Sequence, residues 1–193
     1  MKKIFLFILS IPVIGIYAQK WEKNYDFVDN CICGLSKVKK DGKIGYVSNK
    51  GVEIIKPQYE DGLAFNEGFA AVKTGGRWKY LDSTGKEITE AIFDDALNFY
   101  NGLAAVSKNG LYGFINKWGE VVIPCQFSNA QSFSEGLAAV ANSKSAWGYI
   151  DTKGNWVIKP SYVFANAFEN GKARVMKADK IFYIDKENKE INE

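Results

Sequence analysis

The side chains of this sequence that could act in catalysis, metal binding or stacking on a ligand are carboxylates, cysteines and tryptophans. The 193 residues include no histidine. That absence excludes imidazole bases, histidine metal ligands and nucleophiles activated by histidine. Asp82, Asp151 and Asp185 could supply an acid and a base for glycoside hydrolysis. Corresponding positions of a repeated pattern hold Ser48 and Asn116, however, which fits side chains that cap their own turns. We therefore predict no catalytic residues and no enzyme activity.

Three cysteines are present, Cys31, Cys33 and Cys125. An odd number leaves at least one thiol free or available to another molecule. If Cys31 and Cys33 are neighbours on one strand, they lie about 7 Å apart, which disfavours a disulfide between them. Three thiols without histidine do not complete a four-ligand zinc site. The sequence predicts no metal and no cofactor, and it leaves both disulfide and free thiol open for these cysteines.

Trp118 and Trp156 are the candidate ligand-binding residues. Trp118 stands in a turn where other copies of the pattern have Lys50 and Lys153, and Trp156 stands where another copy has Glu87. Positions that accept charge elsewhere face solvent, so both indoles are expected on the surface, where they could contact a ligand. The alternative is that they bind nothing, because single apolar residues are common on protein surfaces.

Composition and charge narrow the possible classes of protein. With 47% hydrophobic and 15% aromatic residues, the chain has enough apolar material for a folded core. Its 25 basic and 22 acidic side chains give a formal charge of +3. So small an excess of basic side chains does not indicate a positively charged surface for nucleic acid, and no nucleic-acid partner is expected.

Residues 1–18 are typical of a signal peptide. Lys2 and Lys3 precede an apolar run over residues 4–16, and Ala18 supplies a small residue at the cleavage site. The alternative is an uncleaved anchor, but about 13 apolar residues interrupted by Pro12 are short against the roughly 20 that span a bilayer. We expect export to the periplasm, the cell surface or the medium, with no stable membrane span after cleavage.

The rest of the chain, residues 19–193, is built on a repeat. Glycines recur 34 residues apart at Gly34, Gly68, Gly102 and Gly136, and Gly171 follows after 35. A valine stands four residues after each of them. The pattern predicts full units at 34–67, 68–101, 102–135 and 136–170, with partial units at 24–33 and 171–193.

Each unit is predicted to open with a β-hairpin. Alternating apolar residues indicate two strands, and residue pairs that tolerate positive φ lie between them at Asp41-Gly42, Gly75-Gly76 and Asn109-Gly110. A third strand is expected at 53–55, 87–89, 121–123 and 156–158. The segments that follow, such as Tyr59-Gly62-Phe65, place aromatic, small and aromatic residues at intervals of three. That spacing fits either one turn of helix or a tight loop.

The predicted fold is therefore an all-β tandem repeat array of about 34-residue units, open and curved or solenoid-like. The two partial units also permit an alternative. Together they would make a fifth unit, which a closed, propeller-like ring would need.

The unit around Trp147-Gly148 resembles a WG repeat. It reads Gly136-Leu137-Ala138-Ala139-Val140, then Trp147-Gly148-Tyr149-Ile150-Asp151, Gly154, Val157-Ile158-Lys159-Pro160, Tyr162, Ala165 and Phe168. The resemblance covers nearly all of residues 19–193 and implies an all-β repeat protein, often exported, with no catalytic residues. Other units read Ile44-Gly45, Trp78-Lys79, Tyr112-Gly113 and Ile181-Phe182, which indicates that the Trp-Gly pair serves packing rather than chemistry.

Two functions follow as hypotheses. The first is an exported β-repeat scaffold that binds a protein or a surface component through its outer face. The alternative is an envelope carbohydrate-binding module in which Trp118 and Trp156 stack on sugars. Residues 74–85 are also similar to the hairpin repeats of choline-binding and glucan-binding modules, although those repeats are shorter.

Overall fold

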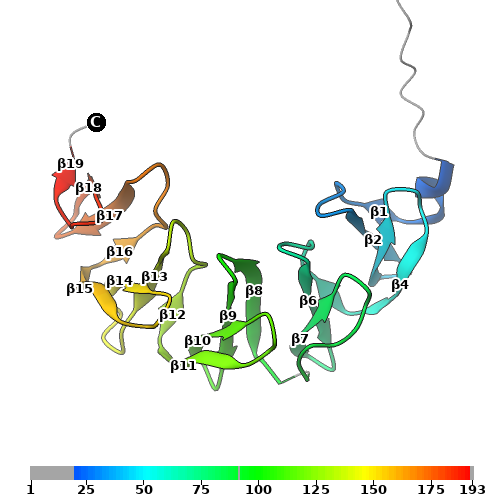
Figure 1. Cartoon of the computed structure of the whole chain (residues 1–193), viewed down its shortest axis with the longest axis horizontal. Helices are drawn as coiled ribbons and strands as arrows, with labels where there is room; N and C mark the ends of the chain where they lie inside the picture. Colours follow the sequence, from blue (N-terminus) through cyan, green and yellow to red (C-terminus); the bar gives the residue numbers. More distant parts are fainter. Residues whose placement is uncertain (1–19, 91, 192–193) are drawn as a thin grey trace, which may run out of the picture.

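The computed structural model describes residues 20–90 and 92–191, so the predicted signal peptide lies outside the described residues. Within them, five antiparallel sheets follow one another along the chain and form an open arc (Figure 1). The ends of the arc lie far apart. The expected open, curved, all-β array is confirmed, and the alternative of a closed ring is not what forms.

The sheets, numbered 1 to 5 in chain order, share one topology in which consecutive strands are neighbours. Sheet 1 follows a short 3-10 helix, η1 (Lys20–Asn24), and contains β1 (Phe27–Val28), β2 (Leu35–Lys40), β3 (Lys43–Ser48) and β4 (Glu53–Tyr59). Sheet 2 contains β5 (Asp61–Gly62), β6 (Phe69–Thr74) and β7 (Arg77–Asp82). Sheet 3 contains β8 (Asp95–Tyr100), β9 (Leu103–Lys108), β10 (Leu111–Asn116) and β11 (Val121–Phe127). Sheet 4 contains β12 (Asn129–Ala130), β13 (Leu137–Ala141), β14 (Trp147–Asp151) and β15 (Trp156–Tyr162). Sheet 5 contains β16 (Phe164–Ala165), β17 (Ala173–Lys177), β18 (Lys180–Ile184) and β19 (Glu190–Ile191).

The structural unit is offset from the sequence unit. Each sheet begins with a strand from the end of one sequence unit and continues with the hairpin of the next. The partial units at 24–33 and 171–193 therefore do not combine. The first supplies β1 to sheet 1, and the second supplies β17 to β19 of sheet 5. The aromatic, small, aromatic segments form strands and loops rather than helical turns.

The predicted hairpin turns are confirmed. Asp41 and Gly42 have φ of 48° and 75°, and Asn109 and Gly110 have φ of 54° and 76°. Positive φ at both central residues defines the type I′ turn, whose twist matches that of the paired strands. The later turn of each unit is also as expected, since Oδ1 of Asp82 accepts backbone N–H groups two and four residues further on.

A pair of aromatic rings joins each sheet to the next. The pairs are Tyr46 with Phe65, Tyr80 with Phe99, Phe114 with Phe133 and Tyr149 with Phe168, at centroid distances between 4.8 and 5.1 Å. All eight rings are buried. Each tyrosine of these pairs also donates its hydroxyl to a backbone carbonyl of the next sheet, at Leu63 (2.7 Å), Leu97 (2.6 Å) and Asn166 (2.8 Å).

The glycine of the Trp-Gly pair lets the third strand approach the hairpin. A Cβ on Gly148 would lie 2.5 Å from the carbonyl oxygen of Ile158 and 2.8 Å from the nitrogen of Pro160. Gly45 and Gly113 meet their own third strands in the same way. No side chain fits at these three positions, which confirms a packing role for the glycine.

Two sheets lack that glycine: Lys79 stands in its place in sheet 2, and Phe182 does so in sheet 5, whose fourth strand β19 has only two residues. The third strand predicted at 87–89 is wrong. That segment makes an isolated bridge between Leu81 and Glu87, and Thr89 accepts the N–H of Tyr80 through its hydroxyl (2.9 Å). A side chain at the glycine position leaves less room for the segment beside β7, and the Thr89 hydroxyl takes the place of a backbone partner for Tyr80. Sheet 2 consequently has three strands.

Both ends of the arc are capped. On the outer face of sheet 5, Lys172 and Arg174 are exposed at the positions that Leu137 and Ala139 fill in the core of sheet 4. A charged outer face is what a terminal repeat needs for solubility, and closing a ring would bury both cations. At the other end η1 lies against sheet 1, where the ring of Trp21 fills the space beside Gly51.

Gly148→Ala tests the role of the glycine. We expect the free energy of unfolding to fall by about 2 kcal/mol, because a methyl group must push β15 away from β14. Chemical denaturation followed by far-UV circular dichroism measures the change. The matched control is Lys79→Ala at the same repeat position, which should cost about 1 kcal/mol or less because a side chain is already accommodated there. Equal losses in the two variants would contradict this assignment.

Candidate functional site

Both predicted tryptophans reach the surface, at separate places. Trp118 is 79% exposed in the turn between β10 and β11, and that turn borders sheet 2 because Gly119 lies against Ile88. Trp156 is 38% exposed at the start of β15, where its ring meets Phe127 of sheet 3 edge to face at 5.7 Å. The hollows of the concave side and of the arc ends are lined by other residues.

The three cysteines are free thiols. Cys31 and Cys33 are exposed, but they do not lie on one strand as expected. Cys33 has a φ of 52° inside a turn that the bridge between Ile32 and Leu35 closes. Cys125 is half-buried with its Sγ 3.9 Å from the carbonyl oxygen of Val106, and burial raises the pKa of this thiol.

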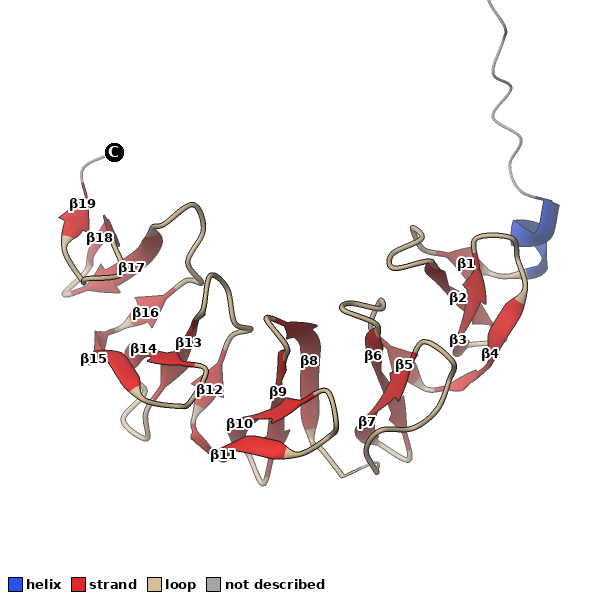
Figure 2. Cartoon of the chain, viewed as in Figure 1, coloured by secondary structure: helices blue, strands red, loops and turns tan. Residues whose placement is uncertain are grey.

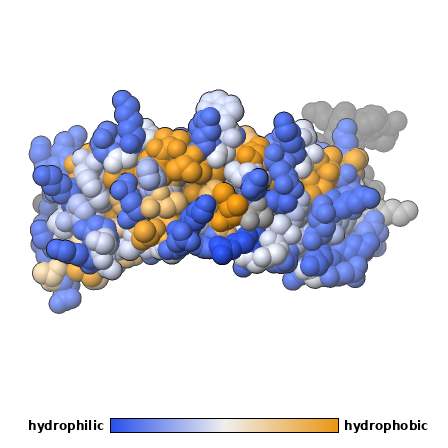
Figure 3. Space-filling model, turned by 90° about the horizontal axis from the view of Figure 1, so that it is seen from below, coloured by the Kyte–Doolittle hydropathy of each residue, from blue (hydrophilic) through white to orange (hydrophobic). Residues whose placement is uncertain are grey.

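The strands β4, β11 and β15 lie on the convex side of the arc (Figure 2), and each of them carries exposed apolar side chains. Figure 3 shows hydrophobic residues in the middle of this face. We name the set Ile54, Val121, Val122, Trp156 and Val157 the convex band; their exposed fractions run from 38% to 57%. Ile54, Val122 and Val157 occupy the same repeat position on sheets 1, 3 and 4.

On the concave side lie the loops that join the first and second strands of each sheet (Figure 1). Each ends in a positive-φ residue followed by glycine. The side chain of that residue accepts a hydrogen bond from the glycine N–H of the following loop. Gly102 donates to Glu67 (2.9 Å), Gly136 donates to Asn101 (3.2 Å) and Gly171 donates to Glu135 (3.2 Å). The loops of sheets 2 to 5 are thus linked into a single row.

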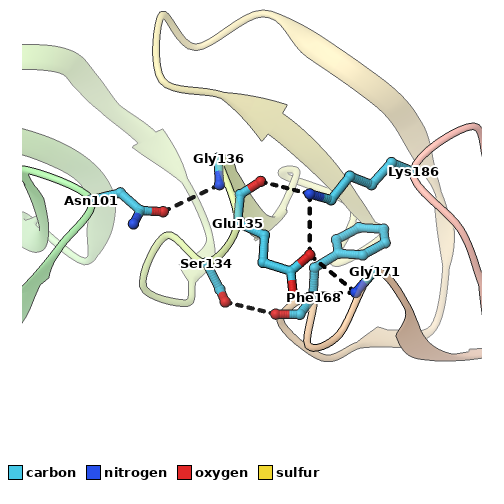
Figure 4. Close-up of polar contacts among 7 residues, drawn as sticks. All are labelled: Asn101, Ser134, Glu135, Gly136, Phe168, Gly171 and Lys186. Atoms are coloured by element: carbon cyan, nitrogen blue, oxygen red, sulfur yellow. Dashed lines mark hydrogen bonds and ion pairs between the residues drawn. The ribbon is translucent and has the colours of Figure 1, made fainter.

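Lysines reinforce alternate links of this row. Lys186 lies 3.1 Å from the Glu135 carboxylate and also donates to the Glu135 carbonyl at 2.9 Å, while Ser134 donates to the carbonyl of Phe168 at 2.6 Å (Figure 4). Lys117 holds Glu67 in the same way at 3.1 Å. The hydrogen bond from Lys186 and the N–H of Gly171 keep the pKa of Glu135 below its ordinary value of 4.5.

Three hollows share lining residues and follow one another from this row of loops to the outer face of sheet 5, where Arg174 lies. Their volumes are about 360, 490 and 260 Å³ in order from sheet 3 to sheet 5. Gln131 and Ser134 line the first two, and Asn166 and Glu169 line the last two. We define the concave groove by Tyr100, Gln131, Ser134, Asn166, Glu169 and Tyr183.

The groove residues were missed from the sequence because their residue types change from unit to unit. Tyr100 of sheet 3 corresponds to Asn66, Ser134 and Glu169 in other units. The available signal was this variation itself, placed between the invariant spacing of buried aromatics and turn glycines.

The described residues give no sign of a metal or a membrane-spanning helix. Across 20–90 and 92–191, no three histidine, cysteine, aspartate or glutamate side chains converge on a possible metal site. In the same part of the chain, no helix is long and apolar enough to cross a bilayer.

The stability that Glu135 contributes should depend on pH. A carboxyl whose pKa is lower in the folded state stabilises the fold above its unfolded pKa, and this contribution is lost as pH falls through the folded pKa. We expect Glu135→Gln to unfold more easily than the native chain at neutral pH, and the difference to shrink below the ordinary pKa of 4.5. Thermal unfolding across pH measures it, with Glu169→Gln, an exposed carboxylate, as control. A difference that does not change with pH would refute the link.

Solved structures resemble the fold at low sequence identity. Hsv2 from Kluyveromyces lactis is 13% identical over 88% of this chain and 62% of its own, with a TM-score of 0.55. A structure described as the eukaryotic initiation factor is 9% identical over 86% of this chain and 53% of its own, with a TM-score of 0.56. The chain spans less than two thirds of either structure, and identities this low show the fold alone. No curated protein matches the chain.

The model of one repeat family accounts for most of the sequence. The family described as WG containing repeat matches residues 44–78, 80–112, 112–143 and 147–180. These segments include the third strands β4, β11 and β15 and the glycines Gly45, Gly113 and Gly148 whose packing is described above. Because they cover more than half of the chain, the protein belongs to the WG-repeat family.

Proposed function

We propose that this protein is an exported, non-catalytic scaffold that binds another protein through the convex band. The observation that carries the proposal is the band itself, with Val121 57%, Val122 42% and Val157 47% exposed on adjacent sheets. Apolar side chains that recur at one repeat position and remain exposed together are typical of an interaction surface.

The surroundings of the convex band suggest the chemistry of its partner. Exposed charges of both signs border it, at Glu53, Lys56, Glu120, Lys153 and Lys159. An apolar centre with a charged rim is the usual anatomy of a protein interface. A complementary partner would present apolar side chains flanked by charged groups of both signs.

Prolines in the outer strands remove backbone N–H groups with which a strand of another protein could pair. Pro57, Pro124 and Pro160 lie in β4, β11 and β15, the outer edge strands of their sheets. Proline lacks the N–H that an added strand would use, and it is a common guard on sheet edges. Recognition through the band would therefore rest on side chains.

The two tryptophans support protein binding better than sugar stacking. Trp156 packs its ring against Phe127, and Trp118 stands in a turn beside a different sheet. The arrangement offers no shared platform on which successive sugar rings could stack.

The binding proposal is tested with the purified chain as bait for envelope proteins. A partner should be captured by the native chain and lost with the double variant Val122→Ser, Val157→Ser, because two apolar contacts are removed. Leu111→Ser is the control, since Leu111 is 40% exposed outside the band. Capture of the same protein by the native chain and by both variants would sink the proposal.

Export is tested in cells by fractionation and mass spectrometry. We expect the full-length chain in the envelope or the medium, with its N-terminus at Gln19, because residues 1–18 carry the basic and apolar regions of a signal peptide. A variant with Leu9→Lys, which places a charge inside the apolar run, should stay in the cytoplasm uncleaved. Cytoplasmic retention of the native chain with Met1 intact would contradict export.

A further inference from the structure

The concave groove presents hydrogen-bonding groups that the fold already holds in place. Gln131 donates its amide to the carbonyl of Ala165 at 3.0 Å, and Ser134 donates to the carbonyl of Phe168 at 2.6 Å. These bonds fix both side chains while leaving the Gln131 amide oxygen and the Ser134 oxygen as acceptors. The groove is thus polar and preorganised, unlike the convex band.

An aromatic ring stands at each end of the groove. Tyr100 is 44% exposed at the sheet 3 end, and Tyr183 lines the sheet 5 end. Faces of exposed aromatic rings are the usual platforms for sugar rings, and amides and hydroxyls between them match sugar hydroxyls. A linear glycan fits this sequence of groups better than a compact ligand does.

The sheet 5 end of the groove carries two cations, Lys172 and Arg174, beside one carboxylate, Glu169. Arg174 lies directly opposite Tyr183 in the β17–β18 register and is exposed, and Lys172 Nζ lies 4.8 Å from the centre of the Tyr183 ring. Within residues 20–90 and 92–191, neither cation has an ion-pair partner. The planar guanidinium of arginine suits a carboxylate, which it binds with two parallel hydrogen bonds.

We propose that the concave groove binds a linear acidic glycan, with a uronic acid carboxylate on Arg174 and a sugar ring against Tyr183. The amide and hydroxyl groups of Gln131, Ser134 and Asn166 bind the sugars toward Tyr100. This site is distinct from the convex band, so glycan binding and protein binding can each be refuted without the other.

Titration of hexagalacturonate into the purified chain by isothermal calorimetry tests the site. We expect saturable binding that weakens with added salt, because a carboxylate meets Arg174 near the surface. Arg174→Ala and Tyr183→Ala should each weaken binding about tenfold. Tyr183→Phe should restore it, since the ring is retained. Maltohexaose, a neutral glycan, should bind more weakly than hexagalacturonate.

Control variants keep the outcome clear. The convex variant Val122→Ser, Val157→Ser should bind hexagalacturonate like the native chain, and Arg174→Ala should still capture the protein partner. Circular dichroism checks that each variant is folded. No saturable binding up to about 5 mM, equal affinity for maltohexaose, or unchanged affinity in Arg174→Ala would overturn the proposal.

Discussion

The arc depends on one repeated contact, the buried ring pair between each sheet and the next. The ring centroids of Tyr149 and Phe168 lie 4.8 Å apart, and the tyrosine hydroxyl donates a hydrogen bond to the backbone carbonyl of Asn166 in the next sheet. Phe114 and Phe133 keep the same ring distance without a hydroxyl. The rings are thus the common element, and the hydrogen bond is an addition worth about 1 kcal/mol. Since every sheet packs only on its neighbours, the ring pairs and the glycine N–H bonds between the concave loops together hold the sheets in order along the arc.

Placing the joints in the interior leaves both faces of the arc free for different chemistry. The convex face carries aliphatic residues such as Val122 on outer strands, whereas the concave face carries the polar loops linked through Glu67 and Glu135. Neither the convex aliphatic residues nor the concave polar residues take part in the ring pairs, so the residue types on both faces can change without loss of the fold. The cations Lys172 and Arg174 serve both demands, because they end the array and also line the groove.

The sequence predicted the architecture because its signals are local. The pair Asn109-Gly110 specifies a turn, and the recurring glycines specify a period, whatever lies around them. The missing strand of sheet 2 was not predicted, because the effect of Lys79 depends on how closely another segment approaches. The exposure of Trp118 and Trp156 followed from charged residues at equivalent positions, whereas the groove arises from loops brought together across three sheets. Such a surface shows in the sequence only as residue types that vary at one repeat position, as at Tyr100, Ser134 and Glu169.

Lys79 has a mechanical consequence. Sheet 2 has three strands where its neighbours have four. Among the described residues, the segment after β7 pairs with it only at the isolated bridges of Leu81 with Glu87 and of Trp78 with Phe93, so we expect sheet 2 to deform more easily than the arms on either side. The shorter arm holds sheet 1 and the thiols of Cys31 and Cys33, and the longer arm holds sheets 3 to 5 with the entire groove. Bending at sheet 2 would change the distance between sheet 1 and sheets 3 to 5, while the groove, which lies wholly on sheets 3 to 5, would keep its shape.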